Sequence, residues 1–248
     1  MGGLRLERRE HAERPWGEEL SPLPWWPGQP VPPLAWETPE DQELPALLIL
    51  DRRAAAGAAT TGELVSLLDR GEQERSARFR RPGDRDRYRL GRAALRQVLG
   101  AWLDRDPAAL RFRYGPHGKP DLDGVIDGAP HFNLAHSGDL ILLALHPSRP
   151  VGVDVELLRP GLDWRPIARR ILPTAAFARL ERLPPEQGGA AFLNAWCRLE
   201  ARLKASGEGL AGLERLRRES APQPGGLALW DVEVPAGYGA AVALAEPL

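Results

Sequence analysis

The sequence predicts an α+β protein, because short apolar runs typical of strands and longer amphipathic runs typical of helices both occur along the chain. Residues 46–50 predict a first strand, and residues 227–234 and 238–244 predict two strands that end the chain in a sheet. Helices are predicted over residues 164–172, 175–183 and 191–205.

Composition narrows the class of protein. A chain of 248 residues can hold one large domain or two of ordinary size. The formal net charge of −1 argues against a dedicated nucleic-acid or membrane-surface protein. The single cysteine, Cys197, excludes an internal disulfide framework. Because no apolar run could span a membrane and the first residues lack the apolar core of a signal peptide, we expect a cytoplasmic protein.

Proline and tryptophan dominate residues 15–45. Proline at this density is incompatible with a regular helix or an interior strand. We expect the four tryptophans of this segment to dock on the folded body, because their rings would otherwise expose a large apolar surface. A flexible leader is the alternative. The tryptophans are Trp16, Trp25, Trp26 and Trp36.

Arginines are dense between residues 75 and 92. Pro82-Gly83-Asp84 interrupts this block, and Asp84 is predicted to cap the helix that follows. The arginines form either a solvated helix face paired with nearby acids or, for a few of them, contacts to a phosphate. A nucleic-acid interface is a weaker interpretation, because aromatic residues are sparse among them and no nucleic-acid-binding motif is present.

Residues 151–156, Val-Gly-Val-Asp-Val-Glu, predict a strand with its valines on one face and Asp154 and Glu156 on the other. Strand geometry places these two acids roughly 6–7 Å apart at Cα, so both can reach one cation. Gly152 leaves room for something to lie against the backbone. The site suits Mg²⁺, which is bound through one or two carboxylates and phosphate oxygens. A half-exposed strand with solvated acids is the alternative.

Two further segments carry polar side chains, one just before a predicted strand and one along a face of a predicted helix. His136 and Ser137 precede the apolar strand 140–145, and residues 146–150 are predicted to turn that strand back onto the acidic one as a hairpin. On the helix 191–205, Glu200 and Lys204 share one face. Such a pair commonly does no more than stabilise a surface helix.

Four motifs taken together, in this order and spacing, resemble the 4′-phosphopantetheinyl transferases of the Sfp type. The resemblance covers about residues 46–244 and leaves the proline–tryptophan segment unexplained. The motifs are Gly118-Lys119-Pro120, Phe132-Asn133-Leu134-Ala135-His136-Ser137-Gly138, Val151-Gly152-Val153-Asp154-Val155-Glu156 and Trp196-Cys197-Arg198-Leu199-Glu200-Ala201-Arg202-Leu203-Lys204.

The resemblance implies a pseudo-dimer of two similar α+β halves with the active site in the cleft between them. The corresponding domains are residues 1–45 as an extension, 46–147 as the N-terminal half and 148–248 as the C-terminal half. It implies transfer of 4′-phosphopantetheine from coenzyme A to a serine of an apo acyl or peptidyl carrier protein, with Mg²⁺ as cofactor and 3′,5′-ADP as the second product. By the same analogy we expect a monomer that binds neither nucleic acid nor a membrane.

The resemblance also implies roles for individual residues. Asp154, Glu156 and Glu200 match the family's metal ligands, and Lys204 matches a lysine that contacts the phosphates; of these, Asp154, Glu200 and Lys204 are the candidate catalytic residues. The coenzyme-binding positions match Arg75, Arg87, Lys119, His136, Ser137 and Lys204.

Three positions depart from the family pattern. Leu199 stands where a lysine is usual, so Leu199→Lys is expected to raise activity if the missing charge limits the rate. Ala135 replaces a serine, and Ala176 stands where many members carry a glutamate proposed as the base, a role that a metal-bound water or Glu181 could take over. The alternative function is therefore a catalytically impaired homologue that binds coenzyme A or a carrier protein without efficient transfer.

Overall fold

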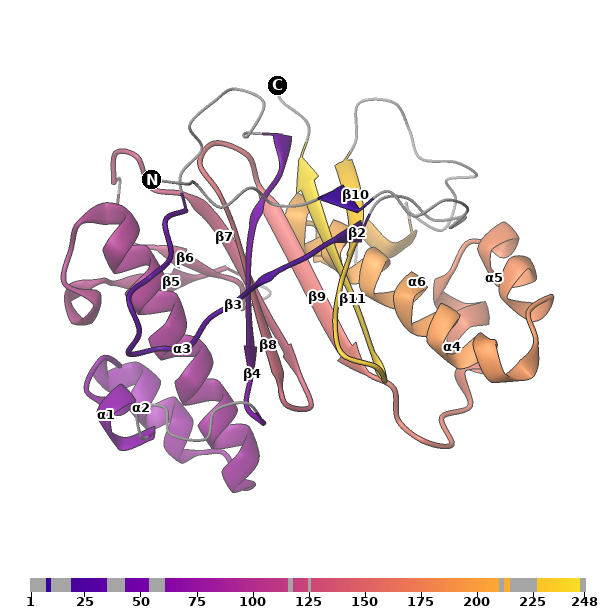
Figure 1. The fold of residues 1–248 in the computed structure, drawn as a ribbon, viewed down its shortest axis with the longest axis horizontal. Helices are drawn as coiled ribbons and strands as arrows, with labels where there is room; N and C mark the ends of the chain where they lie inside the picture. Colours follow the sequence, from indigo (N-terminus) through magenta and orange to yellow (C-terminus); the bar gives the residue numbers. More distant parts are fainter. Residues whose placement is uncertain are drawn as a thin grey trace. The chain divides into compact units, whose positions relative to one another are not determined.

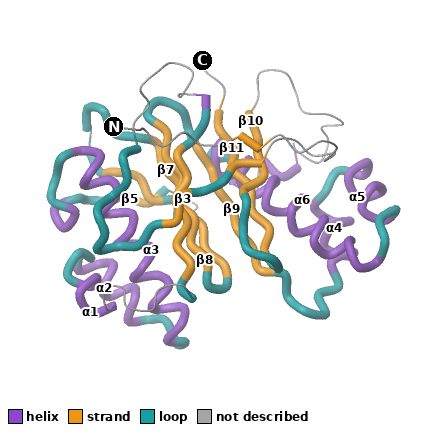
Figure 2. The backbone as a smooth tube through the Cα atoms, viewed as in Figure 1, coloured by secondary structure: helices purple, strands orange, loops and turns teal. Residues whose placement is uncertain are grey.

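The computed structural model describes residues 8–9, 19–34, 43–53, 61–115, 118–124, 126–209, 212–214 and 227–245. This part of the chain is α+β, as the sequence predicts. It divides into two compact units, one containing Leu23–Ser148 and the other containing Leu6–Pro22 and Arg149–Leu248. Within each unit the helices lie to one side of a sheet (Figures 1 and 2). That the two units are similar halves stays a prediction.

The first unit is built on a four-stranded sheet in the order β3-β4-β8-β7. β8 is antiparallel to both neighbours and buried along its whole length. The long helix α3 packs its apolar stripe into the same core (Figure 1). In chain order the elements are β3 (Leu23–Pro24), β4 (Ala46–Asp51), α1 (Thr61–Val65), α2 (Arg70–Ala77), α3 (Pro82–Leu103), a short 3₁₀ helix (Pro107–Ala109), β5 (Phe112–Tyr114), β6 (Pro120–Leu122), β7 (His131–Ser137) and β8 (Leu140–His146).

The second unit is built on a five-stranded sheet in the order β1-β2-β10-β11-β9. Helix α6 runs along β9 and β11, and α4 and α5 pack on α6 (Figure 1). In chain order the elements are β1 (Arg8–Arg9), β2 (Glu19–Leu20), β9 (Val151–Leu157), α4 (Trp164–Ile171), α5 (Thr174–Glu181), α6 (Pro185–Ser206), β10 (Leu227–Val232) and β11 (Tyr238–Ala245).

The predicted hairpin between strand 140–145 and the acidic strand is wrong. β8 already has β4 on one edge and β7 on the other, so neither edge can accept another strand. β9 pairs instead with β11, in the other sheet. The hairpin that does form joins β7 to β8, with Ser137 opposite Leu140.

The predicted cap of α3 is also wrong. The helix begins at Pro82, with Arg81 as its N-cap. Proline suits the first helical position, because its fixed φ matches the helix and its missing N–H would have no partner there. Asp84 lies in the first turn, where a negative charge is favourable beside the free N–H groups.

The proline–tryptophan segment docks through the two tryptophans that the structure describes. Trp25 is 6% exposed inside the core of the first unit, where its Nε1 donates to Pro30 O at 3.0 Å, and Trp26 packs against the same core. Trp16 and Trp36 lie outside the described residues.

The same segment adds one strand to each of the two larger sheets, and β5 and β6 form a separate two-stranded sheet. β2 lies between β1 and β10, so the expectation that this segment has no interior strand is wrong. β2 is free of proline, which explains why it can pair on both sides. β3, which contains Pro24, is an edge strand parallel to β4.

The backbones of α6 and β9 touch at Gly152. A Cβ atom at this position would lie 2.2 Å from Ala201 O and 2.4 Å from Ala205 N. Cys197, Ala201 and Ala205 form a stripe of small side chains on α6 that packs on Ala241 and Ala243 of β11. Since Gly152 pairs with Ala243 and Asp154 with Ala241, this packing brings the last turns of α6 directly over the acidic strand.

This contact predicts that Gly152→Ala lowers the free energy of unfolding by about 3 kcal/mol, because the obstructing atoms are backbone atoms that cannot rotate away. Chemical denaturation measures the change. Gly83→Ala is the matched control: no atom lies within 4 Å of the added Cβ, and stability should stay within about 1 kcal/mol of the parent. Equal stabilities for the two variants would contradict the close approach.

Candidate active site

Asp154 is a buried carboxylate in the middle of β9, only 5% exposed. Its Oδ1 accepts a hydrogen bond from Lys204 Nζ at 2.6 Å, and Nζ also donates to Val153 O at 3.1 Å. Within the described part of the chain, Asp154 Oδ2 is buried and accepts no hydrogen bond. A buried carboxylate oxygen without a partner is costly and indicates a ligand that completes the site. The alternative of solvated acids is therefore wrong for Asp154.

Glu200 and Glu156 extend the negative charge around Asp154. Glu200 lies one helical turn before Lys204 on α6 and is half-buried. Burial raises the pKa of Glu200, Lys204 opposes that rise, and the charges of Asp154 and Glu156 add to it. The charges of Asp154, Glu156 and Lys204 therefore all act on Glu200, and these four side chains are called the carboxylate cluster below.

Cys197 lies beside this cluster but does not take part as a nucleophile. Its Sγ donates to Gly239 O at 3.2 Å, and the side chain is fully buried. Burial, and next the charge of Asp154, raise the pKa of the thiol far above its usual range. The thiol therefore stays protonated, and thiolate is the form that metals and electrophiles need.

The donor set of the cluster fits a hard divalent cation. Three carboxylates and one ammonium leave an excess of two negative charges, and all the available ligand atoms are oxygens, the type that Mg²⁺ prefers. Asp154 Oδ2 is the buried oxygen of this cluster that has no hydrogen-bond partner among the described residues. Among the residues that the structure describes, no three acid, histidine or cysteine side chains converge into a finished metal site.

The other five predicted site residues belong to the unit Leu23–Ser148. His136 is exposed near the end of β7, and Ser137, half-buried, is its last residue. Lys119 lies in the turn between β5 and β6, where Gly115 N donates to Lys119 O at 3.0 Å. Burial and then the ammonium of Lys119 lower the pKa of His131.

The two predicted arginines have different surroundings. Arg75, exposed at the end of α2, has its guanidinium carbon 5.5 Å from the centre of the Tyr88 ring and 5.9 Å from that of Tyr114. Arg87 donates from Nη2 to Asp84 Oδ1 at 2.9 Å, so part of its charge is already compensated. Arg75 is thus the better placed of the two to bind an anion.

Sequence reasoning missed the tyrosines around Arg75 and the buried arginines beside them. Arg92 and Arg96 are buried and both bind Glu72. The interpretation of the arginine block between residues 75 and 92 as a solvated face is therefore wrong for Arg92, and Arg96 lies beyond that block. Their positions, four residues apart within the apolar stripe of α3, were the available signal.

Residues 150–226 match the family model of the 4′-phosphopantetheinyl transferase superfamily. The matched stretch includes β9 and α6, the two elements that carry the carboxylate cluster. This stretch of the chain is therefore similar to the 4′-phosphopantetheinyl transferase superfamily.

Individual members of the superfamily align with more of the chain. The protein is 38% identical over 155 residues to the 4′-phosphopantetheinyl transferase HetI of Nostoc, covering 62% of this chain and 65% of HetI. It is 37% identical over 147 residues to a putative 4′-phosphopantetheinyl transferase of Synechocystis, covering 59% and 60%. It is 35% identical over 127 residues to AcpT of Escherichia coli, covering 50% and 58%. The aligned segments thus span 65% or less of these relatives' own length.

The three departures from the family pattern have structural explanations. Leu199 is 6% exposed in an apolar cluster formed with α4 and α5, and Leu203 shares that cluster. Ala176 packs against the same cluster, while Glu181 stands exposed at the end of α5. Ala135 is buried within β7. Leu199 and Ala176 therefore contribute to the core of the second unit.

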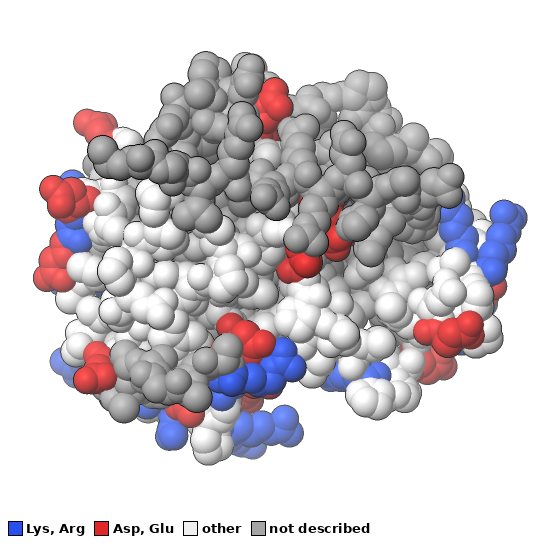
Figure 3. Space-filling view, viewed as in Figure 1, with Lys and Arg blue, Asp and Glu red and all other residues white. Residues whose placement is uncertain are grey.

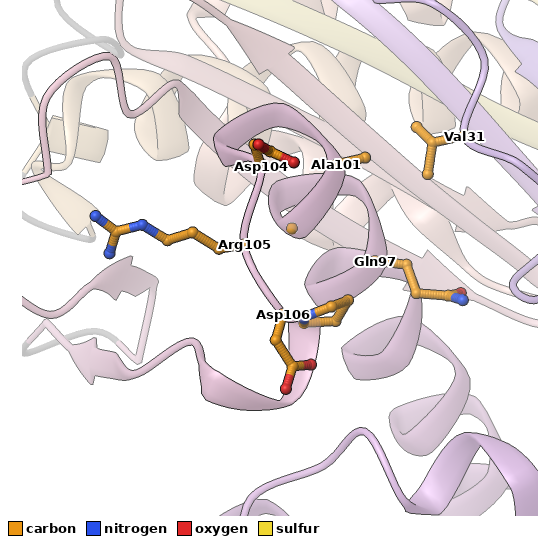
Figure 4. A pocket seen from close by; sticks show the side chains of 8 residues that line it. Val31, Gln97, Ala101, Asp104, Arg105 and Asp106 are labelled. Atoms are coloured by element: carbon orange, nitrogen blue, oxygen red, sulfur yellow. The ribbon is translucent and has the colours of Figure 1, made fainter.

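A pocket of about 430 Å³ lies at the C-terminal end of α3, away from the motifs of the superfamily. Asp104, Arg105 and Asp106 follow the helix end with their side chains pointing in different directions, and Val31 borders the pocket from another segment (Figure 4). None of the predicted site residues lines it. The absence of convergent polar groups gives this pocket no chemistry related to the motifs.

The distribution of surface charge and the hydropathy of the helices bear on whether the protein binds a nucleic acid or crosses a membrane. Among the described residues on the face drawn in Figure 3, basic and acidic side chains are interspersed and form no patch of one sign. This distribution does not favour a polynucleotide interface. No helix in the described residues has the length and apolar character needed to cross a membrane.

The raised pKa of Glu200 predicts that Glu200→Gln increases the free energy of unfolding near neutral pH without added metal. The ionised carboxylate is less favourable in the folded chain than in the unfolded chain, so the variant gains stability above the usual pKa of 4.5. Below that pH both states are protonated and the gain should vanish. Chemical denaturation at about pH 7.5 and about pH 4 measures this gain in the free energy of unfolding. Glu186→Gln, exposed on the same helix, should show no such pH-dependent gain.

The burial of Leu199 predicts that Leu199→Lys lowers the free energy of unfolding by about 2 kcal/mol or more, because it places an ammonium group in an apolar cluster. Thermal or chemical unfolding measures the loss. Ile167→Lys, at a position 38% exposed on α4, is the control and should change stability by less than about 0.5 kcal/mol. A stable and more active Leu199→Lys variant would instead support the expectation drawn from the family pattern.

Proposed function

We propose that the protein transfers the 4′-phosphopantetheine group of coenzyme A to a serine of an apo acyl or peptidyl carrier protein in a Mg²⁺-dependent reaction. The observation that carries this proposal is the cluster of Asp154, Glu156, Glu200 and Lys204 on β9 and α6, with one buried carboxylate oxygen unpartnered. Similarity to the superfamily over residues 150–226 and the names of the relatives support the reaction class.

Asp154, Glu156 and Glu200 would hold Mg²⁺. The cation would supply positive charge to the pyrophosphate oxygens of coenzyme A, where negative charge accumulates as the leaving group departs. Lys204 is fixed by Val153 O and Asp154 Oδ1, so its ammonium is oriented before any substrate binds. We assign it to a phosphate oxygen of the coenzyme, because its ammonium carries the positive charge that favours contact with a phosphate.

The exposed or half-buried groups of the first unit would bind the rest of the coenzyme's phosphates. Arg75, Lys119, His136 and Ser137 are the proposed contacts, and Arg87 is a weaker one because Asp84 already engages it. In the transfer, the carrier serine oxygen bonds to the β-phosphorus, and the bond from that phosphorus to the bridging oxygen breaks. The bridging oxygen keeps the electron pair and leaves as part of 3′,5′-ADP, and the serine proton passes to water. Positioning and charge supply much of the catalysis in phosphoryl-type transfer.

We further propose that the protein works as a monomer in the cytoplasm. The only cysteine is a buried, protonated thiol, which agrees with a reducing compartment.

Intact-mass spectrometry tests the reaction. A panel of apo acyl and peptidyl carrier proteins is incubated with the protein, coenzyme A and Mg²⁺, with an EDTA control. We expect a phosphopantetheine mass gain on at least one carrier, abolished by EDTA. If no carrier gains mass while calorimetry shows that coenzyme A still binds, the protein is instead the non-catalytic homologue.

A second prediction tests the assignment of the carboxylates. Asp154→Asn should lower transfer by at least about a hundredfold, because the amide keeps the size and the acceptor for Lys204 but removes the charge that binds the cation. Calorimetric titration with Mg²⁺ and circular dichroism, which checks the fold, accompany the rate measurement. Glu186→Gln is the charge-matched control on α6. Near-normal turnover by Asp154→Asn would overturn the metal assignment.

A further inference from the structure

Arg75 is held by aromatic rings and not by an acid. Its guanidinium carbon lies within 6 Å of the centres of both the Tyr88 and Tyr114 rings. Within the described residues Arg75 makes no ion pair, whereas the neighbouring Arg70 on the same helix binds Glu74 at 2.9 Å. The ring contacts limit the orientations of the Arg75 guanidinium and leave its N–H groups for a ligand.

Tyr114 also lies near a buried cation. The guanidinium carbon of Arg92 lies 5.8 Å from the centre of the Tyr114 ring and 4.3 Å from that of Phe112. Arg92 is held by Glu72, whose carboxylate also binds Arg96 and is almost completely buried. A continuous series of contacts therefore leads from the buried Glu72 through Arg92 and Tyr114 to the exposed Arg75.

The same cluster has more donors than acceptors. The hydroxyl of Tyr88 and Nη2 of Arg92 are buried and have no hydrogen-bond partner in the described part of the chain. The Tyr88 ring lies near the Arg75 guanidinium, and the Arg92 guanidinium lies near the Tyr114 ring. A surplus of N–H and O–H donors beside two guanidinium groups suits an oxygen-rich anion such as a phosphate.

We propose that Tyr114 is a positioning residue for coenzyme binding: it holds the Arg75 guanidinium in the orientation in which it binds a phosphate of coenzyme A. The inference rests on the proposed function, which assigns Arg75 to the coenzyme. Arginine loses much rotamer freedom when it binds a ligand, so a guanidinium that is already oriented binds more tightly. Tyr114 is 45% exposed, so its ring contributes little to the core.

Calorimetric titration of the parent and of two variants with coenzyme A tests the proposal. Tyr114→Leu should weaken binding about threefold to fivefold, the size expected for the loss of an exposed cation–π contact. Tyr114→Phe keeps the ring and should bind as the parent does. Both variants should unfold at the parent's denaturant midpoint, and carrier modification by Tyr114→Leu should show a raised KM for coenzyme A with kcat unchanged.

A double-mutant cycle separates positioning from direct contact. In an Arg75→Ala background, Tyr114→Leu should have no further effect on the dissociation constant, because the residue that it orients is absent. Arg78 is an exposed arginine one residue beyond the end of α2. In an Arg78→Ala background the effect of Tyr114→Leu should persist in full.

Each contrary result has a distinct meaning. An equal loss with and without Arg75 would show that Tyr114 touches the coenzyme itself, and unchanged binding in Tyr114→Leu would show that the ring plays no part; either result overturns the inference alone. If the parent protein does not bind coenzyme A, the proposed function and this inference both fail.

Discussion

The close contact between Gly152 and α6 is the constraint on which the carboxylate cluster depends. Only a residue without a side chain lets the backbone of Ala201 and Ala205 approach β9 so closely. The small residues on α6 and β11 keep the two elements at this distance along their length. As a result, Lys204 of α6 donates hydrogen bonds to the carbonyl of Val153 and to the carboxylate of Asp154.

The charges of this carboxylate cluster are unfavourable for the stability of the folded chain. Asp154 is buried with one oxygen unpartnered, and burial together with two neighbouring acids raises the pKa of Glu200. One lysine does not balance three carboxylates, so the folded chain bears an electrostatic cost that a bound cation would remove. Such concentrations of like charge in a partly buried position are typical of functional sites. Similarity to the superfamily over residues 150–226 and this local conflict therefore favour the same interpretation.

In the arginine-rich part of the chain, some arginines stabilise the fold and Arg75 is proposed to bind a ligand. Arg92 and Arg96 neutralise the buried Glu72 and fix α2 against α3. Removing one partner of such a buried group would leave an uncompensated charge, whereas exposed pairs such as Arg70 and Glu74 contribute little. Arg75 belongs to neither class, since aromatic rings and not a carboxylate hold it.

The sequence by itself determined most of the elements, and it placed Asp154 and Glu156 on one strand and Glu200 on one helix. Alternation in β9, four-residue spacing in α6 and the short motifs were sufficient, because these signals depend only on local backbone geometry. It did not determine which strands pair, and β9 joined β11 because both edges of β8 were already occupied. Nor could it reveal that Leu199 faces an apolar cluster or that Tyr114 covers Arg75. Those contacts join residues distant in sequence, and only packing of the whole unit decides which of them meet.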